Sequence, residues 1–196
     1  MIRYAQQALK LVLLTLAGLL GSVIIGLMVH GTEVFSPRTI GFLFVSYGLS
    51  GACIFAFYHV RGLSETISAA VVVSVVQFIV SLSWVTVLNA AIWSFGVNLP
   101  IILLAFLFER KLAPLKRFRF VAVAALYGAM FVLLTLCVAV VTGAGLLPGS
   151  VFRQNFLDGM FIGLGLGIGI QGGEAVVDSV EQHSHRHAAV TGKQSS

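Results

Sequence analysis

Four polar side chains lie within long apolar stretches of this sequence and are its best candidates for binding chemistry. They are Gln77, Ser81, Asn98 and Asp158. Amides and hydroxyls donate and accept hydrogen bonds, whereas an ionised carboxylate only accepts them. Inside a bilayer such groups are costly, so they pair with one another or mark a functional site. We therefore predict that these four residues bind a small solute.

Gln77 and Ser81 belong to a polar stripe on one predicted helix. With Ser74 they follow the i, i+3, i+7 spacing of a single helical face, and Asn98 lies in a similar stripe on the next segment. One interpretation is a hydrogen-bonded contact between two helices, in which each bond is worth about 0.6 to 2 kcal/mol. The other is a small polar cavity lined by Gln77 and Asn98, which a kink at Pro100 would favour.

The two stripes belong to a predicted hairpin. Residues 67–108 form an uncharged run of 42 residues, which is about twice the length of one membrane span. Asn89 lies near the middle of this run, between two tryptophans, and tryptophan prefers the membrane interface. We therefore predict a tight turn at Asn89, which would place Ser81 level with Asn98.

Asp158 is the one acid that we expect inside a span, about one helical turn from the outer end of the sixth helix. Arg153 and Arg38 lie on the same predicted side of the membrane and are its expected partners. His30 and Glu33 would complete a polar cluster at this outer face.

The sequence holds no convincing motif for catalysis, metal binding or a cofactor. The run Gly48-Leu49-Ser50-Gly51 resembles the Gly-x-Ser-Gly motif of rhomboid intramembrane proteases, but the predicted sixth span has no histidine to act as a base. On a helix His183 and His187 would share a face that could hold a divalent metal, but with His185 they belong to a polar terminal segment that is more typical of a solvated tail. We therefore predict a non-enzymatic protein without a cofactor or a bound metal.

The composition excludes a water-soluble fold. Hydrophobic residues make up 58% of the 196 residues and charged residues only 10%, compared with roughly 25% charged residues in soluble domains. The mean hydropathy is +1.01. So little charge also excludes nucleic-acid-binding, disordered and secreted disulfide-rich proteins. The chain should be an integral membrane protein.

The apolar runs predict an all-α fold of six transmembrane helices arranged as three hairpins. A bilayer core about 30 Å thick needs roughly 20 apolar residues per helix. The predicted spans are residues 9–30, 40–59, 67–87, 91–108, 119–142 and 154–173. Residues 1–173 would form one membrane domain, and residues 174–196 a short polar tail that contains histidine.

Positive charges are concentrated on one side of this arrangement. If the N-terminus is cytoplasmic, ten of the twelve Lys and Arg residues lie on the cytoplasmic side and only Arg38 and Arg153 lie outside. The positive-inside rule therefore predicts that both termini are cytoplasmic, and we expect a multi-pass protein of a prokaryotic inner membrane. A cluster in residues 109–119 would contact anionic lipids, at about 1 kcal/mol for each cation. Its members are Arg110, Lys111, Lys116, Arg117 and Arg119.

Glycines recur at four-residue spacing in the sixth span. Gly159, Gly163 and Gly167 form one ladder, and Gly165 and Gly169 form a second. Residues two apart point to nearly opposite sides of a helix, so the ladders lie on two faces. Small residues let helix backbones approach closely in lipid. We predict that the sixth helix packs on both faces in the manner of a glycine zipper; alternatively, its carbonyls line a path for a substrate.

Two functions stay open at this stage. The favoured one is a non-enzymatic membrane protein that binds or moves a small solute, or that serves as a membrane subunit of a larger complex. The alternative is a sensory or signalling domain whose tail, from Glu174 onward, contacts a cytoplasmic partner. The expected partners are anionic lipids and either another membrane subunit or a second copy of the chain, and we expect no nucleic acid.

Overall fold

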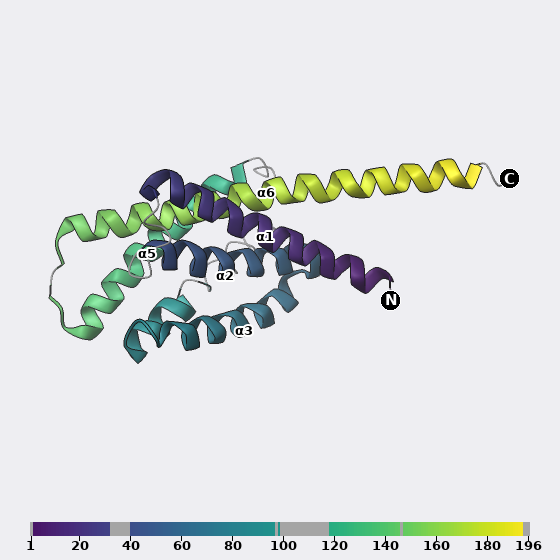
Figure 1. The fold of residues 1–196 in the computed structure, drawn as a ribbon. Coiled ribbons are helices and arrows are strands. Elements are labelled where there is room, and N and C mark those ends of the chain that lie inside the picture. The colour runs from purple at the N-terminus through teal and green to yellow at the C-terminus, as the bar shows by residue number, and fades with distance from the viewer. Residues whose placement is uncertain (1, 32–39, 97, 99–117, 146, 194–196) are drawn as a thin grey trace.

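The computed structural model describes residues 2–31, 40–96, 98, 118–145 and 147–193, and all secondary structure within these residues is helical (Figure 1). Five helices are long and apolar enough to cross a membrane, which confirms the prediction of an all-α, multi-pass membrane protein. The five are α1 (Ile2–His30), α2 (Ile40–Arg61), α3 (Leu63–Ser81), α5 (Arg119–Thr142) and α6 (Gly149–Lys193). A shorter apolar helix covers Val87–Gly96.

A single residue, Gly62, connects α2 to α3. Its φ of 86° lies in the region that residues with a Cβ atom rarely adopt, so glycine suits this position. Its N–H donates to the carbonyl of Tyr58 at 3.1 Å, and its own carbonyl accepts from the N–H of Thr66 at 3.2 Å. The Thr66 hydroxyl donates to the same carbonyl at 2.7 Å. The last turn of α2 and the first turn of α3 are thus linked by hydrogen bonds, and the two helices form a tight hairpin.

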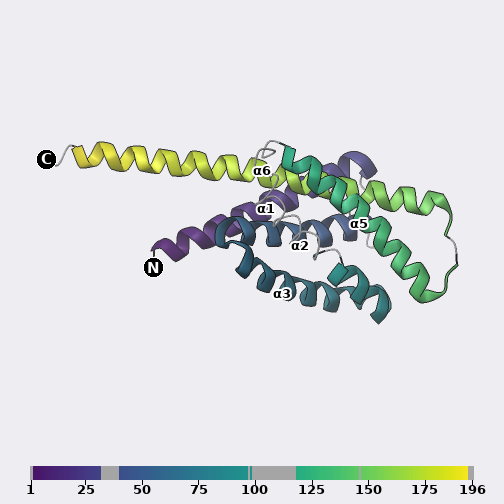
Figure 2. The same cartoon turned by 180° about the vertical axis from the view of Figure 1, so that it is seen from behind.

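Helix α6 packs antiparallel to α1. Gly165 of α6 lies against the backbone of Gly21, and Gly173, further along α6, lies against Leu14, which comes earlier in α1. Both termini of the chain therefore lie at one end of the bundle, and α6 extends beyond the other helices in two opposite views (Figures 1 and 2).

Helix α5 also packs antiparallel to α6, because Gly163 lies against Val123 and Gly159 lies against Tyr127. It therefore runs in the same direction as α1. Helix α2 is antiparallel to α1, with Gly26 against Phe44 and α3 turning back after Gly62. As a result α1, α3 and α5 all run the same way.

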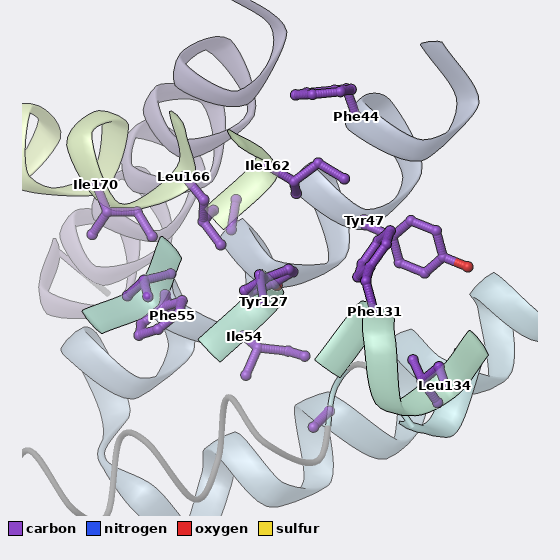
Figure 3. Packing of buried hydrophobic residues seen from close by; sticks show 13 residues of the cluster. Phe44, Tyr47, Ile54, Phe55, Tyr127, Phe131, Leu134, Ile162, Leu166 and Ile170 are labelled. Carbon is purple, nitrogen blue, oxygen red and sulfur yellow. The ribbon is translucent and has the colours of Figure 1, made fainter. Parts of the chain in front are cut away.

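An aromatic cluster holds the short helix Val87–Gly96 against the bundle. Phe131 of α5 makes edge contacts with Tyr47 of α2, at a centroid distance of 5.4 Å, and with Trp93 of the short helix, at 5.3 Å. Tyr47 and Phe131 face each other in the core, beside Leu134 (Figure 3). Such edge contacts are worth about 0.5 to 1.5 kcal/mol beyond the burial of area. This cluster brings the segment that contains Asn98 next to α2 and α5.

The predicted turn at Asn89 is wrong, because α3 ends earlier, at Ser81. Residues 82–86 make the turn, and Asn89 lies inside the following helix. The carbonyl of Ser81 accepts from the N–H groups of both Trp84 and Val85, and the Ser83 hydroxyl donates to the carbonyl of Val80 at 2.6 Å. Serine hydroxyls that bond to nearby carbonyls compete with helix continuation, and they end α3 before the asparagine is reached.

The predicted ends of the last span also differ from the structure. Instead of residues 154–173, α6 covers Gly149–Lys193, which is 45 residues. Proline at 148 precedes it and suits a helix start because it lacks an N–H group to satisfy. The expected tail after residue 173 is therefore a helical continuation of the span. Where a fourth span is predicted, at residues 91–108, the structure has the short helix that begins at Val87, and residues 97 and 99–108 lie outside the described residues.

Candidate functional site

The polar residues of α3 and of the short helix meet inside the bundle in a group that we call the polar centre. Its members are Ser74, Gln77, Ser81, Ser94 and Asn98, each at most 5% exposed. Their spacing along α3 places three of them on one face, and the hairpin at residues 82–86 turns the other two toward that face. The inward orientation of both predicted stripes is what the structure shows.

Asn98 ties the polar centre together. Its Nδ2 donates to Ser74 Oγ at 2.9 Å, to Gln77 Oε1 at 3.2 Å and to the carbonyl of Ser94 at 3.1 Å. The prediction that Asn98 lies level with Ser81 is therefore wrong, because Asn98 bonds to Ser74 and Gln77 instead. The turn comes about five residues before Asn89. Asn98 therefore lies beside residues of α3 that precede Ser81 by one to two helical turns.

Several polar atoms of this centre are buried without a hydrogen-bond partner among the described residues. They are Gln77 Nε2, Ser81 Oγ, Ser94 Oγ and Asn98 Oδ1. Buried polar groups are nearly always hydrogen-bonded to protein or water, and an unpaired one costs about 1 to 3 kcal/mol. The polar centre therefore has the capacity to bind a further polar group.

A groove of about 420 Å³ lies between α2 and α3 and reaches one member of the polar centre, Gln77. Asn98 is not among its lining residues, so the predicted cavity is bordered by only one of the two amides. The lining residues are Val45, Ser46, Leu49, Ser50, Cys53, Val72, Val73, Val76, Gln77 and Val80. The groove is aliphatic, with polar atoms at a few points only.

Ser50, from the motif that resembles the rhomboid nucleophile, borders this groove. Its hydroxyl donates to the carbonyl of Tyr47 in the same helix at 3.1 Å. Since Ser50 hydrogen-bonds within its own helix, the structure offers no support for a nucleophilic role.

Asp158 is not part of the groove lining and is 5% exposed. Its Oδ1 accepts from Gln154 Nε2 at 2.9 Å and lies 3.3 Å from His30 Nε2. Because α6 begins at Gly149, Asp158 lies nine residues, or about 13 Å, inside the helix and not one turn from its end. A buried carboxylate within an apolar helix is a functional candidate.

The expected cluster around Asp158 forms only in part. His30 is in place, whereas Arg153 is exposed, and a five-residue separation puts it about 140° around the helix from Asp158. Glu33 and Arg38 lie outside the described residues. Sequence reasoning missed Gln154, although its position four residues before Asp158 could have revealed it.

A second histidine–carboxylate pair, also missed, joins α2 to α6. His59 Nδ1 lies 3.1 Å from Glu174 Oε1, and both side chains are partly exposed. Sixteen residues separate Asp158 from Glu174, which is about 24 Å along a helix. Two acids of α6, about 24 Å apart along the helix, thus each pair with a histidine of a neighbouring helix.

The glycines of α6 face two different helices. Gly159 and Gly163 lie against the α5 backbone, whereas Gly165 and Gly169 lie against the α1 backbone. Gly167 is buried. The two ladders therefore lie on two faces, and both are in contact with neighbouring helices.

The predicted lipid-binding cations lie almost entirely outside the described residues. Arg110, Lys111, Lys116 and Arg117 belong to that part of the chain, and Arg119 is the first residue of α5. Among the residues that the structure does describe, no three His, Cys, Asp or Glu side chains are grouped to hold a metal ion.

Comparison of this chain with protein-family models, with curated proteins and with solved structures finds no match.

Proposed function

We propose that this chain is a non-enzymatic membrane protein that binds a small, uncharged and largely apolar molecule in the groove between α2 and α3. The observation that carries this proposal is Gln77, whose side chain lines the groove and whose amide nitrogen is buried without a hydrogen-bond partner among the described residues. A ligand atom that accepts a hydrogen bond from this nitrogen would remove the cost of leaving it unpaired.

The lining of the groove indicates the chemistry of the ligand. No charged side chain is part of it, so a charged ligand would have no counter-charge there. The lining residues of α3 run from Val72 to Val80, about 12 Å along the helix. The ligand therefore combines a hydrocarbon part with one acceptor, such as a carbonyl or ether oxygen. Val72 and Val76 are exposed on a membrane-spanning helix, so the molecule reaches the groove from the bilayer.

Replacing Gln77 tests this site. The protein is purified in a mild detergent, and the neutral apolar molecules extracted from it are quantified by mass spectrometry. We expect Gln77→Leu to lower the amount bound by roughly two- to tenfold, the value of one hydrogen bond. Asn98→Leu is the matched control, because it breaks the same Asn98–Gln77 bond but keeps Gln77 in the lining of the groove. Equal amounts in wild type and Gln77→Leu would contradict the proposal.

The direction of the helices supports a sixth crossing. Since α3 and α5 run in the same direction, the chain between them has to return, and we propose that residues 87–108 cross the membrane. Three hairpins then leave both termini on one side, which the distribution of Lys and Arg assigns to the cytoplasm. The cations of residues 109–119 would lie on that side, next to anionic lipids.

Single cysteines at exposed serines test this topology. After Cys53 and Cys137 are replaced by alanine, Ser83→Cys and Ser150→Cys should react with an impermeant maleimide from outside the cell. Ser64→Cys should react only after the membrane is opened. If residues 87–108 did not cross, Ser83→Cys and Ser150→Cys would lie on opposite sides, and that outcome would exclude six spans.

A second candidate function is that of a sensory or signalling domain, and the length of α6 favours it. Its 45 residues span about 68 Å, roughly twice the thickness of a bilayer core. A continuous helix can transmit a movement in the membrane to a partner in water. The test compares proteins that copurify with the full chain and with a chain ending at Val180. A partner lost on truncation would support signalling, and an unchanged set would argue against it.

A further inference from the structure

The His30–Asp158 pair lies at a junction of three helices and takes no part in the groove. His30 is the last residue of α1, which ends there because Gly31 adopts a φ of 62°. The imidazole packs edge-on against the ring of Phe44 in α2, at a centroid distance of 5.9 Å. Asp158 contributes the carboxylate from α6.

We propose that this pair is a proton-binding site within the membrane. With one proton the pair is neutral overall, whether the proton resides on the imidazole or on the carboxyl group. Loss of that proton leaves a carboxylate that is 5% exposed, without a cation at His30. Because an uncompensated charge is costly in a low-dielectric environment, proton release weakens the contact between α1 and α6.

Gln154 gives the site a route to water. Its amide donates to Asp158 Oδ1 and also borders an open pocket of about 510 Å³ at the start of α6. Ser150 and Arg153 border the same pocket. The side chain of Gln154 alone therefore separates the buried carboxylate from this pocket. The site exchanges its proton with water at the start of α6, when that side chain moves aside.

Other titratable groups near Asp158 are few among the described residues. Arg153, on α6 itself, is exposed and points away. Tyr127, from α5, directs its hydroxyl toward Gly51 of α2 and not toward Asp158. From α2, the apolar Phe44 packs against His30. Glu33 and Arg38 follow His30 in the chain, outside the described residues. His30 is thus the group expected to govern the charge of Asp158.

The small number of aspartates makes a direct test possible. The chain contains only Asp158 and Asp178, and Asp178 is exposed. In a full-length Asp178→Asn protein labelled with ¹³C-aspartate, infrared spectra report the protonation of Asp158 alone. We expect the carboxyl band to titrate with pH. His30→Gln should increase the proton affinity of Asp158 by about tenfold or more, because the neighbouring cation is lost.

Two further variants complete the test. His30→Lys supplies a cation that stays charged to higher pH and should keep Asp158 ionised. Its effect on the proton affinity of Asp158 is opposite to that of His30→Gln, and it can be measured if His30→Gln does not fold. His59→Gln removes the other histidine–carboxylate pair and should leave the Asp158 titration unchanged. The proposal is overturned if Asp158 stays in one protonation state at every pH at which the protein is folded, both in the protein with His30 and in the His30→Gln variant. It is equally overturned if neither substitution of His30 moves the titration.

Discussion

Replacement of Gly163 by leucine is expected to disrupt the packing of α6 on α5 more than any other change described here. A Cβ atom at this position would lie 2.6 Å from the carbonyl oxygen of Val123 and 2.9 Å from Cα of Ala124. Both are backbone atoms, which cannot rotate away as a side chain does. Overpacking costs about 1 to 3 kcal/mol even where neighbours can shift. We expect the thermal midpoint in detergent to fall by roughly 5 °C or more.

Gly172→Leu is the matched control for this experiment. Gly172 lies on the same helix, and a Cβ atom there would meet nothing within 4 Å. Gly31 also has open space around it, but it is a less suitable control position. Its φ of 62° would strain the backbone of any residue with a side chain. Equal midpoints for Gly163→Leu and Gly172→Leu would contradict close packing of α6 against α5.

Asn98→Leu is expected to have the second largest effect on stability. The substitution keeps a similar volume but removes the donor to Ser74 Oγ and Gln77 Oε1, both of which are buried. Leaving buried acceptors unpaired costs about 1 to 3 kcal/mol. The free energy of unfolding, measured by denaturant titration in mixed micelles, should fall by that amount.

Ser83→Ala serves as the comparison for Asn98→Leu. It also removes a side-chain hydrogen bond, from the Ser83 hydroxyl to the carbonyl of Val80, but at an exposed position where water can replace it. Its effect should stay within about 0.5 kcal/mol. If Asn98→Leu proved as mild, the polar centre would not hold α3 to the short helix.

The sequence predicts the inward faces better than the ends of the helices. The spacing of Ser74, Gln77 and Ser81 fixes one face of α3, because one side of a membrane helix has to cover its polar groups. The turn was harder to predict. Asparagine is a strong turn residue, yet the hydroxyl of Ser83 and the carbonyl of Ser81 end the helix first.

Contacts between side chains that are far apart in the sequence were the least predictable part of the candidate sites. His30 and Asp158 both lie near the predicted outer side, so their proximity could be expected, whereas the partner of His59 could not. Hydropathy also places the end of the last span near Gly173, because it measures transfer into lipid and not helix formation. The helix continues to Lys193 in spite of two consecutive glycines.

The connection between α2 and α3 determines how the groove can open. One residue, Gly62, joins the helices, and consecutive Cα atoms are about 3.8 Å apart. The end of α2 and the start of α3 are therefore held together. The two helices can separate only at their opposite ends, the start of α2 and the end of α3. Val45 and Val80 border the groove near these ends. A molecule entering from the bilayer would pass between them first, and the width of this mouth would limit the size of ligand admitted.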